Sequence, residues 1–178
     1  MASINRREFL GRARSTGLGI AGGLTILRNA SSVRAAPANE KVVLAAVGVA
    51  GRGDSLVEGF LDRGDCEMAY VCDVDSNVGE SRGQKYAKRQ GRSPRCVQDF
   101  RKALDDKSVD AVVIATPTHW HALATIWSCQ AGKDVYVEKP LCHSAWEGQK
   151  MVEAARKYRR VVQVGTQNRS APYNQAAR

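Results

Sequence analysis

Residues 42–60 read VVLAAVGVAGRGDSLVEGF: an apolar run, a cluster of glycines, and a segment with the spacing of an amphipathic helix. The run at 42–47 is typical of a strand buried on both faces, and a helix is predicted over 54–61. The glycines between them favour a tight turn from strand to helix. Two interpretations are open at this point: a loop that holds the phosphates of a nucleotide, or a turn that needs no ligand.

Short apolar runs and longer amphipathic segments continue to alternate down to residue 164. Further strands are predicted over 67–72, 95–97, 111–115, 134–137 and 161–164. Further helices are predicted over 78–89, 99–104, 119–130 and 145–158. Because the strands are apolar and β-branched without polar alternation, the pattern indicates parallel strands covered on both faces. The sequence therefore predicts an α/β fold with an open, doubly wound parallel sheet.

Four sequence features follow directly after predicted strands. Right-handed crossovers place the carboxyl ends of all parallel strands at one edge of the sheet, and ligands of such sheets bind at that edge. The features are Gly48–Gly53, Asp73, Thr116–Pro117 and Glu138-Lys139-Pro140. We expect them to lie near one another.

The glycine loop matches the dinucleotide fingerprint G-x-G-x-x-G at Gly48 and Gly53, but Ala50 stands at the middle position. The first glycine permits the tight turn, and the last permits close packing of helix on strand. Ala50 adds a methyl group where the backbone approaches a pyrophosphate. Gly51 and Arg52 lie beside it, and the amides at the start of the helix still face a phosphate.

Asp73 ends the second strand, 20 residues after Gly53. An acid at this spacing hydrogen-bonds the adenosine ribose hydroxyls of a dinucleotide, and its charge repels a 2′-phosphate. The alternative is that Asp73 or Asp75 caps the next helix, a role that Asp75 suits better. The loop, the spacing and the acid together favour NAD, with NADP less favoured.

The fourth and fifth strands end in further candidates. Thr116 and Pro117 make a sharp exit that could line a cofactor. His119 and His121 lie two residues apart and so do not share a helix face; we expect His119 to cap or pack and His121 to face the nicotinamide side. Lys139 either projects its ammonium into the cleft as an acid or base, or forms a surface pair with Glu138 before a turn proline.

The N-terminal residues have the layout of an export signal. Residues 1–38 contain six arginines and one glutamate, with Arg6-Arg7 ahead of the apolar, glycine-rich stretch 17–27 and a region of small residues after it. The apolar stretch is shorter than the roughly 20 residues that span a bilayer. We expect a twin-arginine-type signal peptide over 1–38, export to the periplasm, and a dinucleotide-binding domain over 39–178. The alternative is a basic tail.

The remaining charges and the cysteines narrow the function classes. Residues 39–178 carry 21 basic and 17 acidic side chains, well mixed, so we expect no nucleic-acid partner. The five cysteines form no C-x-x-C pair, and we expect neither a metal site nor a disulfide framework.

Five segments occur in the order seen in the Gfo/Idh/MocA oxidoreductase family and resemble its N-terminal, cofactor-binding half. They are the glycine loop, VCDVD (71–75), ATPTHWHA (115–122), VEKPL (137–141) and VGTQNRSAPYN (164–174). The resemblance implies a Rossmann-like fold, with Asp73 at the ribose and Thr116 and Pro117 along the cofactor. It places Glu138 and Lys139 beside the nicotinamide, Lys139 as the catalytic residue, and Gln167 near the same cleft.

The resemblance also implies an activity: NAD-dependent hydride transfer to or from a carbinol carbon of a sugar or polyol. The alternatives are an NAD-dependent glycosidase of the same family and a non-catalytic nucleotide-binding module or fragment. In the family a second, α+β domain supplies most substrate contacts and much of the oligomer interface. We expect the 178-residue chain to lack it, to be inefficient or inactive alone, and to form a homo-oligomer only with it.

Overall fold

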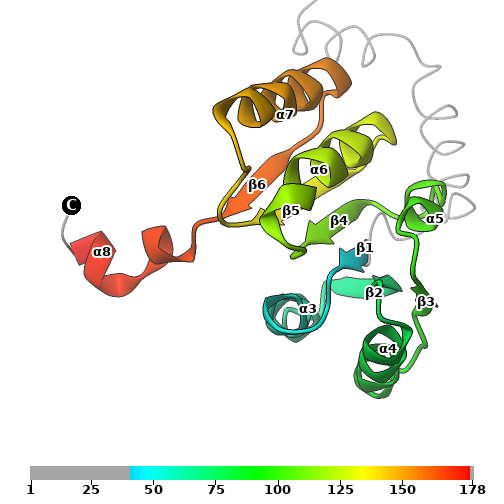
Figure 1. Ribbon diagram of the computed structural model, residues 1–178. Coiled ribbons are helices and arrows are strands. Elements are labelled where there is room, and N and C mark those ends of the chain that lie inside the picture. Colours follow the sequence, from blue (N-terminus) through cyan, green and yellow to red (C-terminus); the bar gives the residue numbers. More distant parts are fainter. Residues whose placement is uncertain (1–40, 177–178) are drawn as a thin grey trace, which may run out of the picture. The chain divides into compact units, whose positions relative to one another are not determined.

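The computed structural model describes residues 41–176 (Figure 1), and the predicted signal peptide at 1–38 lies outside these residues. The strands are β1 (Val42–Val47), β2 (Cys66–Cys72), β3 (Arg95–Val97), β4 (Ala111–Ile114), β5 (Asp134–Glu138) and β6 (Val162–Gly165). The α-helices are α3 (Arg52–Asp62), α4 (Ser76–Gln90), α5 (Arg101–Leu104), α6 (His121–Gln130), α7 (Ala145–Tyr158) and α8 (Pro172–Ala176). Two 3-10 turns, η1 (Thr118–Trp120) and η2 (Gln167–Ser170), precede α6 and α8.

The strands form one parallel sheet in the order β3-β2-β1-β4-β5-β6. The chain moves outward from β1 to β3, then returns to the other side of β1 for β4. The switch in strand order therefore falls between β1 and β4, where ligands of such sheets bind. The predicted α/β, doubly wound, Rossmann-like fold is confirmed.

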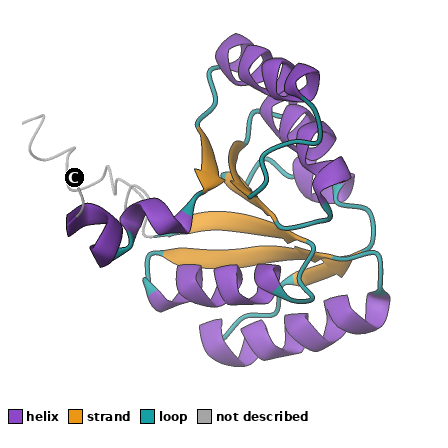
Figure 2. Ribbon diagram, turned by 60° about the vertical axis from the view of Figure 1, so that its left-hand side comes forward, coloured by secondary structure: helices purple, strands orange, loops and turns teal. Residues whose placement is uncertain are grey.

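Helices cover both faces of the sheet (Figure 1), and Figure 2 shows the strands as a layer between them. Leu44 and Ala46 of β1 pack in the core under α3 and α4, whereas Ala45 and Val47 pack in the core under α5, α6 and α7. Because alternate residues of β1 serve two different cores, the strand is apolar throughout.

Two helices begin two residues later than predicted, for local reasons. The helix predicted over 99–104 begins at Arg101, because the Asp99 carboxylate accepts the Arg101 N–H at 3.0 Å and makes a turn there. The helix predicted over 119–130 begins with the 3-10 turn η1 and becomes α-helical at His121. Among residues 41–176, no helix has both the length and the apolar character needed to cross a membrane.

Candidate functional site

The glycine loop between β1 and α3 is packed so closely that a side chain at two of its glycines would collide with backbone atoms. Gly48 has a φ of +79°, and a Cβ there would lie 2.9 Å from the Ala115 carbonyl oxygen and from the Thr116 nitrogen. A Cβ at Gly53 would overlap the carbonyl oxygen of Gly48. At Gly51, by contrast, a Cβ would meet no atom within 4 Å. Gly48 and Gly53 thus shape the turn, and Gly51 leaves open space.

The start of α3 has no side-chain cap, unlike the starts of α4 and α7. Asp75 caps α4 by accepting the Asn77 N–H at 2.9 Å, and Ser144 caps α7 in a capping box. The first amides of a helix need acceptors, and an uncapped helix start is suited to an anion. The loop therefore presents the donors that a phosphate group requires.

Asp73 joins the end of β2 to this loop. One carboxylate oxygen accepts the Val49 N–H at 2.9 Å, and the other accepts the Asp75 N–H at 3.1 Å. These bonds fix the orientation of the carboxylate, and each oxygen keeps a second lone pair for another donor. Asp75 caps α4, the role that the sequence favoured for it, and Asp73 contacts the glycine loop. The contact of Asp73 with a ribose stays a prediction.

A pocket of about 670 Å³ lies at the carboxyl ends of β1, β2 and β4, beside α5 and α6. It is lined by six of the predicted site residues: Gly48, Ala50, Gly51, Asp73, Thr116 and Pro117. Cys72 also lines it, and burial raises the pKa of this thiol to about 12, so it stays protonated. The pocket places apolar walls beside a fixed carboxylate and a glycine loop, an arrangement suited to a nucleotide.

The far end of the sheet edge is linked to the loop by one ion pair. Arg52 Nε donates to Glu138 Oε1 at 2.8 Å, although the two residues are 86 positions apart. The other Glu138 oxygen accepts the Lys139 N–H at 3.0 Å, and Glu138 is only 4% exposed. The hydrogen bond to Glu138 raises the pKa of Arg52, so the guanidinium stays charged. Glu138 thus connects the loop with exposed Lys139.

Comparison with known proteins agrees with this geometry. The family model for Gfo/Idh/MocA, described as "Oxidoreductase family, NAD-binding Rossmann fold", matches residues 35–166. The chain belongs to this family. The match covers the NAD-binding domain of these oxidoreductases.

Individual curated proteins match the chain over part of their length. An α-N-acetylgalactosaminidase of Shewanella oneidensis is 28% identical over 172 residues, and a glycosyl hydrolase family 109 protein of Shewanella sp. strain ANA-3 is 31% identical over 173. Each alignment covers 87% of this chain and 38% of the relative. The chain therefore spans well under half the length of these relatives.

A solved structure also superposes on the chain. It is the WlbA dehydrogenase of Bordetella pertussis in complex with NADH and UDP-GlcNAcA, 26% identical with a TM-score of 0.66. The superposition covers 76% of this chain and 40% of that one.

The two histidines after β4 take the opposite places from those predicted. His121 is 1% exposed, and its ring nitrogens lie 2.8 Å from the carbonyl oxygens of Pro140 and Thr116. His119 is exposed and lines the pocket. The prediction failed because η1 delays the α-helix to His121, which turns that ring inward between the ends of β4 and β5. His121 therefore positions the two exits and is closed to a ligand.

Gln167 and Lys139 lie apart from the pocket lining. Gln167 is exposed at the start of η2, after β6, and Lys139 is exposed beside a cis peptide bond to Pro140. Gly165 at the end of β6 leaves room for Glu138, since a Cβ there would lie 2.9 Å from Glu138 Oε1. The proposed contacts of Gln167 and Lys139 with cofactor or substrate stay predictions.

Sequence reasoning missed the wall of the pocket that follows β3. Gln98, Asp99, Phe100 and Arg101 line it, and the Phe100 ring stacks on Trp127 of α6 with centroids 5.8 Å apart. The signal is present: β3 is predicted at 95–97, and residues that follow any strand of a parallel sheet reach the same edge. The stack itself joins α5 to α6 and carries no local sequence pattern.

Proposed function

We propose that this chain binds NAD at its glycine loop and is the cofactor-binding half of an oxidoreductase acting on a sugar or polyol. The observation that carries the proposal is the shared position of three features at one pocket: the uncapped start of α3, the open space at Gly51, and the fixed carboxylate of Asp73. The first two suit a pyrophosphate, and the third suits a ribose diol.

The preference for NAD over NADP follows from charge. A 2′-phosphate on the adenosine ribose would lie next to the Asp73 carboxylate, and these two negative charges would repel each other. The WlbA dehydrogenase structure that superposes on this chain contains NADH, which supports this choice.

The reaction needs residues at the nicotinamide end of the edge. Bound NAD supplies a hydride acceptor or, when reduced, a hydride donor. Lys139 then holds or moves the proton of the substrate hydroxyl, while Glu138 and Arg52 fix the backbone beside it. The second domain of the family would close this site and exclude water.

An NAD-dependent glycosidase is the second candidate, because both Shewanella relatives named above carry glycosidase names. In that case the sugar is oxidised only transiently to assist elimination. An aryl glycoside of N-acetylgalactosamine and the free sugar, each offered with NAD to a chain that includes the second domain, separate the two candidates. A glycosidase releases the phenol without net NADH, whereas a dehydrogenase accumulates NADH from free sugar.

Titration of the 178-residue chain with NAD and NADP by calorimetry tests the proposed function directly. We expect saturable binding of NAD and weaker binding of NADP. The absence of NAD binding would contradict the proposal.

Export through the twin-arginine route is part of the proposal for residues 1–38. This route carries folded proteins, so a bound dinucleotide could travel with the domain. Replacing Arg6 and Arg7 with lysine should retain the protein in the cytoplasm, and cell fractionation with an antibody to the domain measures this. Unchanged periplasmic protein would contradict it.

A further inference from the structure

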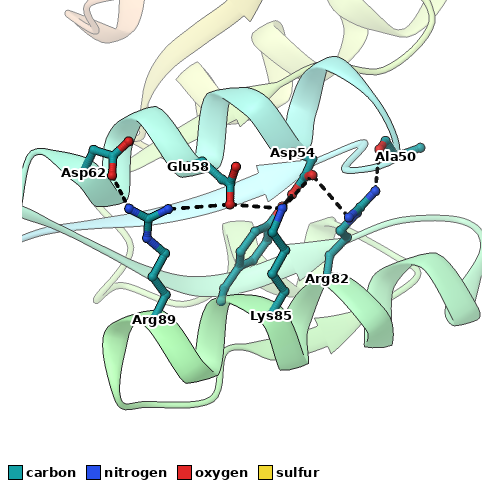
Figure 3. A network of polar contacts seen from close by, with 8 residues as sticks. Ala50, Asp54, Glu58, Asp62, Arg82, Lys85 and Arg89 are labelled. Carbon is teal, nitrogen blue, oxygen red and sulfur yellow. Dashed lines mark hydrogen bonds and ion pairs between the residues drawn. The ribbon is translucent and has the colours of Figure 1, made fainter.

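A row of ion pairs joins α3 to α4 along one side of the domain (Figure 3). The α3–α4 row consists of Asp54, Glu58 and Asp62 on α3 and Arg82, Lys85 and Arg89 on α4. The acids are four residues apart, so they lie on one face of α3 and meet the basic residues of α4 in turn. One end of the row lies at the glycine loop.

Arg82 occupies that end and makes two contacts. Its Nη1 lies 3.2 Å from Asp54 Oδ2, and its Nη2 donates to the carbonyl oxygen of Ala50 at 3.1 Å (Figure 3). Asp54 is held in place by Lys85 and by the Tyr86 hydroxyl, which donates to it at 2.9 Å. The guanidinium is thus braced on α3 while it holds a carbonyl of the loop.

Arg89 occupies the other end of the same row. It pairs with Glu58 at 3.5 Å and with Asp62. It shares the helix and residue type of Arg82, and the two side chains have similar exposure, 39% and 32%. Arg89 is therefore a matched comparison for Arg82 that touches α3 at residues remote from the loop.

The contact with Ala50 determines the direction of the neighbouring amide. The Ala50 carbonyl and the Gly51 N–H belong to one planar trans peptide group, and they point in opposite directions. With the carbonyl directed at α4, the N–H of Gly51 is directed away from α4. The pocket lies on that side, since Phe100 and Trp127 of its wall belong with α5 and α6 on the other face of the sheet.

Gly51 is also the place where a ligand can come closest to the loop. A Cβ at Gly51 would have no neighbour within 4 Å, whereas the loop residue before it, Ala50, carries a methyl group. The fingerprint of dinucleotide-binding loops has glycine at the position of Ala50. The open approach in this chain is thus displaced by one residue.

We infer that Arg82 is a positioning residue of the phosphate loop: it holds the Ala50–Gly51 peptide so that the Gly51 N–H donates to the pyrophosphate of NAD. The inference rests on the proposed function. A cation donating to the carbonyl also polarises the peptide and strengthens its N–H as a donor. Gly51 with Arg82 thereby takes the place of the middle glycine that this loop lacks.

Calorimetric titration with NAD of three chains tests the inference: wild type, Arg82→Ala and Arg89→Ala. Thermal unfolding comes first, and we expect both variants to be folded with similar midpoints. Arg82→Ala loses one ion pair and one hydrogen bond, and Arg89→Ala loses two ion pairs. We expect Arg82→Ala to weaken NAD binding about tenfold, the effect of one lost charge-assisted hydrogen bond. Arg89→Ala should bind as the wild type does, and Arg82→Lys should recover part of the loss.

The Gly51 amide gives a second readout in the free protein. In a ¹⁵N–¹H spectrum, Arg82→Ala should shift or broaden the Gly51 resonance, and Arg89→Ala should leave it in place. Equal NAD affinities for the two alanine variants, or an unmoved Gly51 resonance in Arg82→Ala, would overturn the inference while the proposed function stands. A wild-type chain that binds no NAD would overturn both.

Discussion

Asp73 and Asp75 show how two identical side chains two residues apart acquire different tasks. Asp75 accepts amides of the helix that it begins, and Asp73 accepts the Val49 and Asp75 amides at the pocket. The two tasks differ because the two acids stand at different elements. Asp73 follows the end of β2, which lies beside β1, and Asp75 stands directly before α4. Replacing Asp73 and Asp75 separately therefore tests the proposed ribose contact of Asp73.

Replacing Asp73 with serine should weaken NAD binding roughly tenfold and NADP binding less, because the variant loses a ribose acceptor but also a charge that repels the 2′-phosphate. Calorimetric affinities for both cofactors measure the difference. Asp75→Ala is the matched control: it should lower stability by about 1 kcal/mol through the lost cap and leave the NAD affinity unchanged. Equal losses for NAD and NADP would limit Asp73 to holding the loop.

At the scale of elements, the junction of β1 and α3 depends on Gly53, whose Cα packs on the Gly48 carbonyl. The pairing of α3 with α4 depends on Asp54. Burial alone would raise the pKa of Asp54, but hydrogen bonds from Lys85 and Tyr86 outweigh burial and lower it from 3.8. Both features hold the glycine loop from outside the pocket.

Gly53→Ala should destabilise the domain by about 1–3 kcal/mol, because the added methyl group overlaps the Gly48 carbonyl and the backbone must move. Gly59→Ala, on the open side of the same helix, should instead stabilise it by about 0.5–1 kcal/mol. Urea unfolding followed by circular dichroism measures both. A Gly53→Ala variant as stable as the wild type would show that the junction yields easily.

Acid should weaken the α3–α4 pairing. A carboxyl whose pKa is lowered by folding stabilises the protein above its unfolded pKa of 3.8, and that stabilisation is lost as the pH falls through the folded pKa. The wild type should therefore lose stability below about pH 4, and Asp54→Asn should lose less over the same interval. Urea midpoints at neutral and acid pH test this; parallel losses in the two proteins would assign the acid sensitivity to other carboxyls.

At the scale of the whole molecule, the site has two ends that the sheet edge connects. The pocket lies at β1, β2 and β4, and Lys139 lies further along the edge, at the end of β5. Arg52 and Glu138 form the connection between them. The proposed cofactor binding and proton handling thus involve different residues, and mutation should separate them.

Lys139→Ala should leave NAD affinity intact, in the 178-residue chain and in a chain that includes the second domain. In the latter it should reduce turnover by about a hundredfold or more, the usual contribution of a general acid or base. Calorimetry measures the first effect and steady-state assays with sugars the second. Undiminished turnover would remove Lys139 from the chemistry.

The local pattern of the sequence determined the strands, the order of elements and the edge at which Gly48, Asp73 and Thr116 meet, because burial on both faces of a parallel sheet leaves its mark in consecutive residues. Only the tertiary structure decided which way His121 turns and which partner Arg52 takes. These contacts join side chains to elements far apart in the chain, and the spacing of residues along the sequence does not predict such contacts.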